Sequence, residues 1–311
     1  MRIAAMAAGA VGGYFGGRMA AAGHDVAFIA RRAHLDAIRS NGLVINSVHG
    51  DLHLKDVNVT DDPREVGPVD VVLFAVKLWD TEAAATLAHP MVGPDTRVIT
   101  LQNGVDSVER VAPILGAERT VAGTAYIATV IAQPGVISHT SKFAIMRVGR
   151  IDGRPDQKLD AFAEAARAAK LDVTVMPDMN SERWQKFIFL SSMAGVNCMT
   201  RLPIGQVLAD PDTRAFFHRL MAECEAVAKA SGVKLPAGYV DDRMTFADNA
   251  PPGMKASMLH DLEAGNRLEL DWLTGKVVAL GKERGVPTPA SEAVYAAVKL
   301  HRMGRSEGAQ R

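Results

Sequence analysis

Short apolar runs alternate with helix-like patterns over the first half of the 311-residue chain. The runs RIAAM, DVAFIA, VDVVLFAVK and RVITLQNG have the length and the Val, Ile and Phe content of buried strands. Strand runs that alternate with helical stretches predict parallel strands joined by crossover helices. We therefore expect an α/β sheet domain here.

Two stretches of this half are expected to add antiparallel strands. GLVINSVHGDLHLKDVNVT alternates around Gly50 and Asp51, which predicts a small antiparallel excursion at the sheet edge. Further strand runs surround a turn at Pro134 and Gly135. A helix over 156–169 and the strand LDVTVM close this domain.

Beyond Pro177 the strand runs give way to long periodic patterns of Ala, Leu and Met. The predicted fold is thus α/β followed by all-α, with domains at 1–178 and 179–311. Helices are expected over 181–198, 212–231, 239–248, 257–264 and 268–284.

Composition narrows the class of ligand. Lys plus Arg and Asp plus Glu both number 35, so no overall field attracts nucleic acid or an anionic membrane. No apolar stretch approaches the roughly 20 residues of a membrane span, and the N-terminus lacks a signal-peptide pattern. The two cysteines and nine histidines show no metal-ligand spacing. We expect a cytoplasmic protein that binds a small molecule, without a metal.

The opening MRIAAMAAGAVGGYFGG predicts a strand, a glycine-rich turn and a helix. In a Gly-x-Gly-x-x-Gly dinucleotide loop, the glycines make the turn, admit the pyrophosphate and let the helix pack on the strand. Alanine at the first place costs roughly 1 to 2 kcal/mol only if its φ is positive. Such turns also occur at other strand-to-helix corners, so the flanking elements carry the assignment. The candidate pyrophosphate site comprises Ala7, Ala8, Gly9, Ala10, Val11 and Gly12.

The residues after the second strand favour NADP(H) over NAD(H). The acidic residue that usually binds the ribose 2′-hydroxyl, about 20 positions beyond the loop, is absent. Arg31 and Arg32 stand there instead. A guanidinium can form two hydrogen bonds with a 2′-phosphate. Arg31 is our candidate ligand, whereas Arg32 fits an exposed loop position.

Lys77 in FAVKLWD and Asn103 in LQNGVD follow two other strand runs. The carboxyl ends of parallel strands are where α/β sheets bind ligands. An exposed loop lysine and a left-handed turn asparagine before Gly104 are the structural alternatives.

The ordered set AVK, LQNG, WQKF, SMLHDLEAGNRLELDWLTG and GVPTP resembles the ketopantoate reductase family over nearly the whole chain. The resemblance implies an NADP-binding Rossmann domain, a helical second domain, and reduction of 2-dehydropantoate to pantoate in pantothenate biosynthesis. It further implies that Lys77 and Asn103 lie beside the cofactor, and Asn103 near the substrate.

Lys186 in SERWQKFIF and Glu269 in RLELD match the family's catalytic lysine and glutamate. Hydride arriving at a carbonyl carbon builds negative charge on the oxygen, which an ammonium can stabilise and protonate. The family glutamate lies near the substrate hydroxyl and the nicotinamide ribose. A solvent-facing lysine and a first-turn carboxylate are the alternatives.

Ser257 matches the family's substrate-binding serine, with a plain N-cap as its alternative. On one unbroken helix Ser257 and Glu269 would lie about 18 Å apart. A break is therefore expected at Gly265 and Asn266, with a second helix starting near Leu268.

Leu190 and Ala194 stand where the family has two substrate-binding asparagines. Asn197 is a candidate for part of their role, or an ordinary polar helix residue. The loss of two amides makes the pocket more apolar. A same-fold reductase of a more apolar ketone or imine, and a non-catalytic NADP-binding sensor, therefore remain rival hypotheses. The expected reaction site is a cleft between the domains, and the apolar helical domain is compatible with a homodimer.

Overall fold

The computed structural model describes residues 1–305. The chain forms two compact units, Met1–Glu182 (unit 1) and the residues from Arg183 onward (unit 2). The division falls inside one long helix, which begins at Met179, directly after the boundary expected from the sequence.

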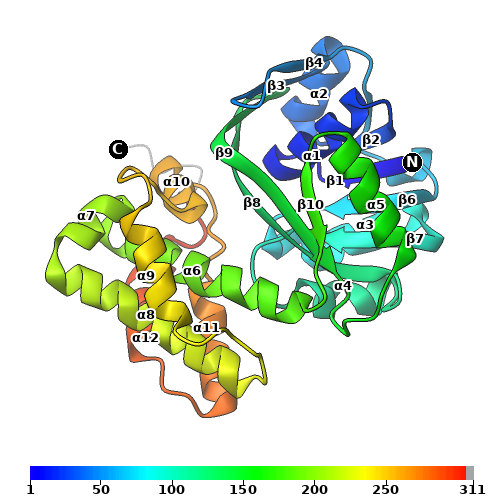
Figure 1. The fold of residues 1–311 in the computed structure, drawn as a ribbon. Coiled ribbons are helices and arrows are strands. Elements are labelled where there is room, and N and C mark those ends of the chain that lie inside the picture. The colour runs from blue at the N-terminus through cyan, green and yellow to red at the C-terminus, as the bar shows by residue number, and fades with distance from the viewer. Residues whose placement is uncertain (306–311) are drawn as a thin grey trace. The chain divides into compact units, whose positions relative to one another are not determined.

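Unit 1 is built on one ten-stranded sheet in the order β4-β3-β9-β8-β7-β6-β1-β2-β5, with β10 beside β9 (Figure 1). The β3/β4 and β8/β9 pairs are antiparallel and the other pairs are parallel. The strands are β1 (Arg2–Met6), β2 (Asp25–Ile29), β3 (Leu43–Ser47), β4 (Leu52–Leu54), β5 (Asn58–Thr60), β6 (Val69–Phe74), β7 (Val92–Thr100), β8 (Thr120–Gln133), β9 (Val136–Gly149) and β10 (Asp172–Val175).

Helices cover both faces of this sheet because successive strand residues point to opposite sides. In β1, Ile3 and Ala5 join the core under α1, α2 and α5, whereas Ala4 and Met6 join the core under α3 and α4. The helices of this unit are α1 (Ala10–Ala21), α2 (Arg32–Asn41), α3 (Thr81–Ala88), α4 (Ser107–Leu115) and α5 (Gln157–Ala168).

The structure differs from the predicted elements of unit 1 in three places. Helices α2 and α4 were not expected, although both are short amphipathic helices. β5 does not extend the antiparallel β3/β4 excursion but lies parallel to β2. The runs on either side of Ser141 form the single strand β9.

Unit 2 contains helices and no strands among its described residues, which confirms the predicted order of α/β followed by all-α. The helices are α6 (Met179–Thr200, starting in unit 1), α7 (Ile204–Ala209), α8 (Pro211–Ala230), α9 (Tyr239–Asp248), α10 (Ser257–Ala264), α11 (Thr274–Arg284) and α12 (Pro289–Val298).

A buried carboxylate binds the N-terminus of α12. Glu223 of α8 accepts hydrogen bonds from the Ala290 and Ser291 backbone N–H groups at 2.7 and 2.8 Å, and from the Ser291 hydroxyl at 2.8 Å. These are groups that a helix N-terminus leaves without intrahelical acceptors. Glu223 therefore fixes α12 to α8.

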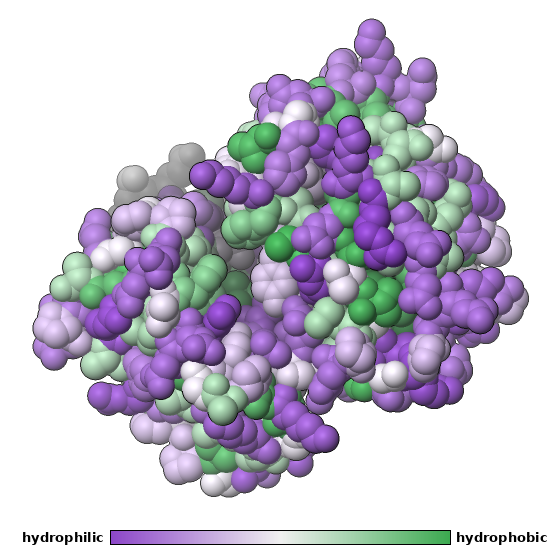
Figure 2. Space-filling model, in the orientation of Figure 1, coloured by the Kyte–Doolittle hydropathy of each residue, from purple (hydrophilic) through white to green (hydrophobic). Residues whose placement is uncertain are grey.

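Hydrophilic residues cover most of the visible face of unit 1, with smaller hydrophobic patches among them (Figure 2). Over 1–305, none of the helices has both the length and the apolar character to cross a bilayer.

Cys198 and Cys224 are both buried free thiols, and burial raises the pKa of each.

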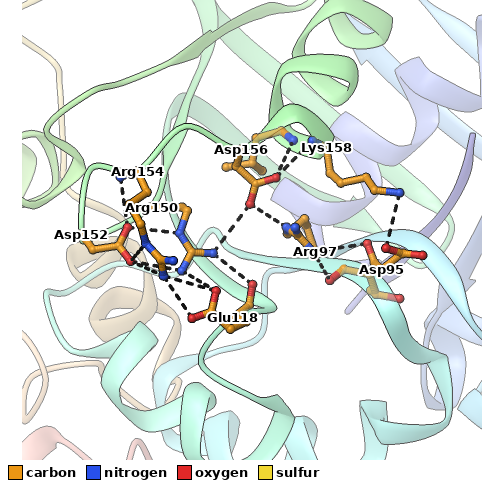
Figure 3. Close-up of polar contacts among 10 residues, drawn as sticks. Asp95, Arg97, Glu118, Arg150, Asp152, Arg154, Asp156 and Lys158 are labelled. Carbon is orange, nitrogen blue, oxygen red and sulfur yellow. Dashed lines mark hydrogen bonds and ion pairs between the residues drawn. The ribbon is translucent and has the colours of Figure 1, made fainter.

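An ion-pair network fixes the loop between β9 and α5 (Figure 3). Asp156 is 6% exposed, caps α5, and accepts a hydrogen bond from Arg97 Nε at 2.7 Å. Arg150 lies 3.7 Å from the same carboxylate and also binds Glu118. Burial on its own raises the pKa of Asp156. The hydrogen bond and charge of Arg97, with two helix N–H groups, outweigh burial and hold that pKa below its ordinary value of 3.8.

Replacing Asp156 with asparagine should lower the free energy of unfolding by about 2 kcal/mol at pH 7, because a buried charge-assisted hydrogen bond is lost. A depressed folded-state pKa contributes stability above the unfolded pKa and loses it as pH falls through the folded value. The difference from wild type should therefore shrink below about pH 4. Urea unfolding at pH 7 and pH 3 measures both. The control E118Q alters a largely exposed member of the network and should have little effect.

Candidate active site

Four predicted cofactor positions lie at one edge of the unit 1 sheet. β7, β6, β1 and β2 are consecutive parallel strands, so their carboxyl ends meet at the same edge. Asn103, Lys77, Gly9 and Arg31 follow these strands in that order. The sheet therefore brings the four predicted cofactor residues to one ligand-binding edge.

The glycine turn after β1 leads directly into α1, which is the order of elements predicted for a dinucleotide loop. Gly9 is the N-cap of α1, and its cap position has no side-chain hydrogen bond. A Cβ at Gly12 would overlap the Ala7 carbonyl oxygen, so only glycine lets α1 pack this closely on the loop. Ala7 is not among the residues with positive φ within 1–305, so the strain considered for alanine there does not arise.

The open space around Gly9 is evidence for a ligand site beside this turn. Its φ of −71° and ψ of −165° are extended values that any residue adopts, and a Cβ there would meet no atom within 4 Å. The protein itself therefore does not require glycine at this position. Open space next to a helix N-terminus suits a pyrophosphate, because the first backbone N–H groups and the helix dipole favour an anion.

His34 of α2 contacts this loop, and sequence reasoning missed that contact. Its Nε2 lies 2.9 Å from the Ala8 carbonyl oxygen, and its Nδ1 accepts from the Gly135 N–H at 3.1 Å. These partners favour the neutral ring with its proton on Nε2. Burial lowers the pKa of His34 below 6.5, and the hydrogen bond to Ala8 acts in the opposite direction. No local sequence pattern distinguishes such a histidine from a surface one.

Arg31 is exposed at the N-cap of α2 and forms an ion pair with Asp80, with Arg31 Nη2 and Asp80 Oδ2 3.3 Å apart. Its side chain is 62% exposed. Arg32 is also exposed, as expected, and has a φ of 55°.

Lys77 lies on a turn that Gln102 holds in place. The Lys77 ammonium stands 5.6 Å from the centre of the Trp79 ring, and its side chain is exposed. Gln102 is 7% exposed and donates to the Val76 carbonyl at 3.0 Å and to Thr81 Oγ1 at 2.8 Å. The turn from 76 to 81 is therefore anchored to the end of β7.

Asn103 is half-buried at the end of β7. The positive φ in this turn belongs to Gly104, at 94°, and Asn103 is absent from the positive-φ residues of the described chain. The alternative of a left-handed turn asparagine is therefore wrong.

In unit 2, Lys186 is half-buried on α6 between fully packed aromatic residues. Trp184 and Phe187 are 4% and 1% exposed, with ring centres 5.5 Å apart. Tyr239 of α9 donates to the Gln185 carbonyl at 2.6 Å. These contacts fix the helix that carries the ammonium.

The Asn197 side chain forms hydrogen bonds with backbone groups of the protein. It is 0% exposed, donates to the Leu202 carbonyl at 2.9 Å and accepts from the Ala256 N–H at 2.9 Å. This geometry does not support the expected substrate contact. Instead, Asn197 positions the start of α10.

Ser257 is the first residue of α10 and is exposed. The N-cap is Ala256, and that cap position has no side-chain hydrogen bond. The alternative of Ser257 as a plain N-cap is therefore wrong.

Glu269 lies in the segment between α10 and α11. The predicted break is confirmed, because α10 ends at Ala264 and its C-cap, Gly265, has a φ of 75°. The helix expected from Leu268 begins only at Thr274, so Glu269 belongs to the preceding turn rather than to a first helical turn. It is 6% exposed and stands between the buried Leu268 and Leu270, which hold this segment in the core of unit 2.

No three His, Cys, Asp or Glu side chains within 1–305 are grouped so that they could hold a metal ion. The candidate chemistry therefore consists of the glycine loop with its polar neighbours in unit 1, and of Lys186, Ser257 and Glu269 in unit 2.

Comparison with known proteins finds similar proteins over nearly the whole chain. The family model described as "Ketopantoate reductase PanE/ApbA" matches residues 3–153, and its C-terminal counterpart matches residues 178–302. A 2-dehydropantoate 2-reductase of Mesorhizobium japonicum is 32% identical over 96% of this chain and 97% of the relative.

Two solved structures are similar over nearly the whole chain. A PanE/ApbA family ketopantoate reductase from Ralstonia eutropha JMP134 has a TM-score of 0.90 and 33% identity, covering 97% of this chain and 98% of its own. A 2-dehydropantoate 2-reductase from Geobacter metallireducens GS-15 has a TM-score of 0.91 and 31% identity, covering 96% and 99%. The chain therefore belongs to the ketopantoate reductase family, and it is an oxidoreductase that uses NADP(H).

Proposed function

We propose that this protein reduces 2-dehydropantoate to pantoate with NADPH. The observation that carries the proposal is the half-buried Lys186, which stands on the firmly packed α6 of a family member that also has a dinucleotide loop. The relatives named 2-dehydropantoate 2-reductase support this substrate. A place in pantothenate biosynthesis, a cytoplasmic location and a homodimer remain predictions.

The cofactor would be held by unit 1. The N–H groups at the start of α1, beside Gly9, would receive the pyrophosphate, and Arg31 the 2′-phosphate. Lys77 and Asn103 would contact the remaining part of the cofactor from the ends of β6 and β7. When bound, NADPH supplies the hydride.

Unit 2 would supply proton chemistry and substrate contacts. The Lys186 ammonium stabilises the negative charge that develops on the carbonyl oxygen and donates the proton that completes the hydroxyl. Glu269 accepts a hydrogen bond from that hydroxyl and orients it. The exposed Ser257 hydroxyl binds a polar group of the substrate. Asn103, in unit 1, remains a predicted substrate ligand.

Leu190 and Ala194 favour a second candidate, a more apolar 2-keto acid. Leu190 is half-buried and Ala194 is buried, so neither offers the amide that the family usually has at these places. NADPH oxidation followed by absorbance should compare 2-dehydropantoate with bulkier and more apolar 2-keto acids. The highest kcat/KM for 2-dehydropantoate supports the first candidate. No turnover of any keto acid would favour a binding protein without catalysis.

Replacing Arg31 with alanine should weaken the binding of NADPH far more than that of NADH, because only NADPH has the 2′-phosphate. One lost charge-assisted contact corresponds to about 10- to 100-fold in KM for NADPH. Steady-state kinetics with each cofactor measures this ratio. R32A is the matched control and should change the KM for either cofactor little. Equal effects of R31A on both cofactors would contradict the phosphate role.

A further inference from the structure

We propose that Asp80 limits the preference for NADPH, so that the same site also accepts NADH. This inference rests on the proposed binding of the 2′-phosphate by Arg31. It concerns a carboxylate three residues beyond Lys77 to which the sequence alone assigned no role. Its support comes from the position of Asp80, the rigidity of its turn, and the charge of the two cofactors.

Asp80 lies against the 2′-phosphate ligand. Its Oδ2 is 3.3 Å from Arg31 Nη2, although the two residues are 49 positions apart. Arg31 follows β2 and Asp80 follows β6, and these strands flank β1 with its glycine loop. The pair thus joins the two turns on either side of the glycine loop. A phosphate held by Arg31 would lie within a few ångströms of the Asp80 carboxylate.

The turn that carries Asp80 is fixed on several sides. The Asp80 N–H donates to the Lys77 carbonyl at 2.9 Å. Thr81 Oγ1 donates to the Leu78 carbonyl at 2.8 Å, and Arg110 donates to the same carbonyl at 2.8 Å. Gln102 binds Val76 and Thr81 from β7. The carboxylate therefore stands on an anchored turn, whereas the Arg31 side chain is long and exposed.

The two cofactors respond differently to this carboxylate. A ribose 2′-phosphate carries nearly two negative charges at pH 7, so Asp80 repels it and competes with it for Arg31. A ribose 2′-hydroxyl is neutral and can donate a hydrogen bond to a carboxylate, which is how the usual acidic residue of NAD sites works. The sequence lacks that acid after β2, and the tertiary structure supplies a carboxylate from the turn after β6.

The replacement D80N tests this directly. Asn has the same shape, and Asp80 makes no side-chain cap hydrogen bond to α3, so folding should be unchanged. Calorimetric titration of the full chain with NADP⁺ and NAD⁺, and with 2′,5′-ADP and 5′-AMP, needs no turnover. We expect D80N to bind NADP⁺ and 2′,5′-ADP about tenfold more tightly. The affinity for NAD⁺ and 5′-AMP should stay the same or fall.

The control is D95N, which removes one exposed carboxylate near the amino end of β7, away from the ligand edge. It should alter neither affinity. The D80N effect should also shrink at 0.5 M salt, because the repulsion is between solvent-accessible charges. An unchanged ratio of NADP⁺ to NAD⁺ affinity in D80N would overturn the inference. So would a lower ratio, since Asp80 would then be orienting Arg31 for the phosphate.

The proposed function and the role of Asp80 can fail independently, and the two failures give different results. If wild-type protein binds NADP⁺ but does not reduce 2-dehydropantoate, the substrate proposal fails and the D80N comparison can still be made. If D80N fails to change the ratio while 2-dehydropantoate is reduced, only the role of Asp80 is lost.

Discussion

Replacing Lys186 with alanine is expected to lower kcat for keto acid reduction by about 10²- to 10⁴-fold. The ammonium is the group that we propose both stabilises the developing oxyanion and donates the proton. The methyl group of alanine does neither. Because α6 is held by buried neighbours on either side, Trp184 and Phe187, the helix itself should persist in the variant. Steady-state NADPH oxidation measures the loss in kcat.

Two control variants test whether the loss in kcat is specific to Lys186 and whether it reflects the lost proton donor or the lost charge. K229A removes an exposed lysine of α8 that pairs with Glu225 at 2.8 Å, and it should leave kcat unchanged. K186R keeps the positive charge, but a guanidinium is a poor proton donor near neutral pH. K186R should therefore recover part of the oxyanion stabilisation and little of the proton transfer.

Cofactor binding provides a further check. Lys186 has no proposed contact with the cofactor, so K186A should bind NADP⁺ as wild type does. If K186A reduced the keto acid within a few-fold of the wild-type rate, the general-acid assignment would be wrong, whatever its cofactor affinity.

The second large effect is expected for G9A, which should weaken NADP⁺ binding by about 5- to 150-fold. A methyl group there would occupy the open space in which we place the pyrophosphate, and overpacking of this kind typically costs about 1–3 kcal/mol. The backbone at Gly9 is in an extended region that alanine adopts freely, with no protein atom within 4 Å of the added carbon. The free energy of unfolding should therefore change by less than about 0.5 kcal/mol.

G12A is the informative contrast in the same loop. Its added carbon would overlap the Ala7 carbonyl oxygen, so the loop or α1 must shift. Both folding stability and NADP⁺ affinity should fall, the former by about 1–3 kcal/mol. G253A, a glycine in unit 2 that also has open space around it, should change neither. Normal NADP⁺ binding by G9A would remove the reason for placing the pyrophosphate there.

Much of the fold follows from local patterns. The buried strands β1, β2 and β6 are short apolar runs, a pattern typical of strands covered on both faces of a sheet. The end of α10 can also be predicted locally, because its C-cap, Gly265, readily adopts the φ of 75° found there. The start of α11 at Thr274 was harder to predict, since the turn from Glu269 to Leu273 has the composition of a helix.

The candidate site residues also divide into those whose partners are near in the chain and those whose partners are distant. Gly12 could be identified from its spacing in the glycine loop, because the steric demand that it meets comes from a residue five positions away. Asn197 was misjudged because its partner, Ala256, lies 59 positions further along the chain. His34 and Glu223 were not anticipated for the same reason, since their partners belong to distant elements.

The sequence by itself determined the α/β and all-α order, the glycine loop, and the helix that presents Lys186. Periodicity and backbone sterics act over a few residues and can be read from their spacing. Only the tertiary structure decided that Asp80 reaches Arg31, that Asn197 is buried under α10, and that Glu269 lies in a turn. Those outcomes depend on which strands become neighbours and which helices pack together, and no local spacing encodes such long-range partners.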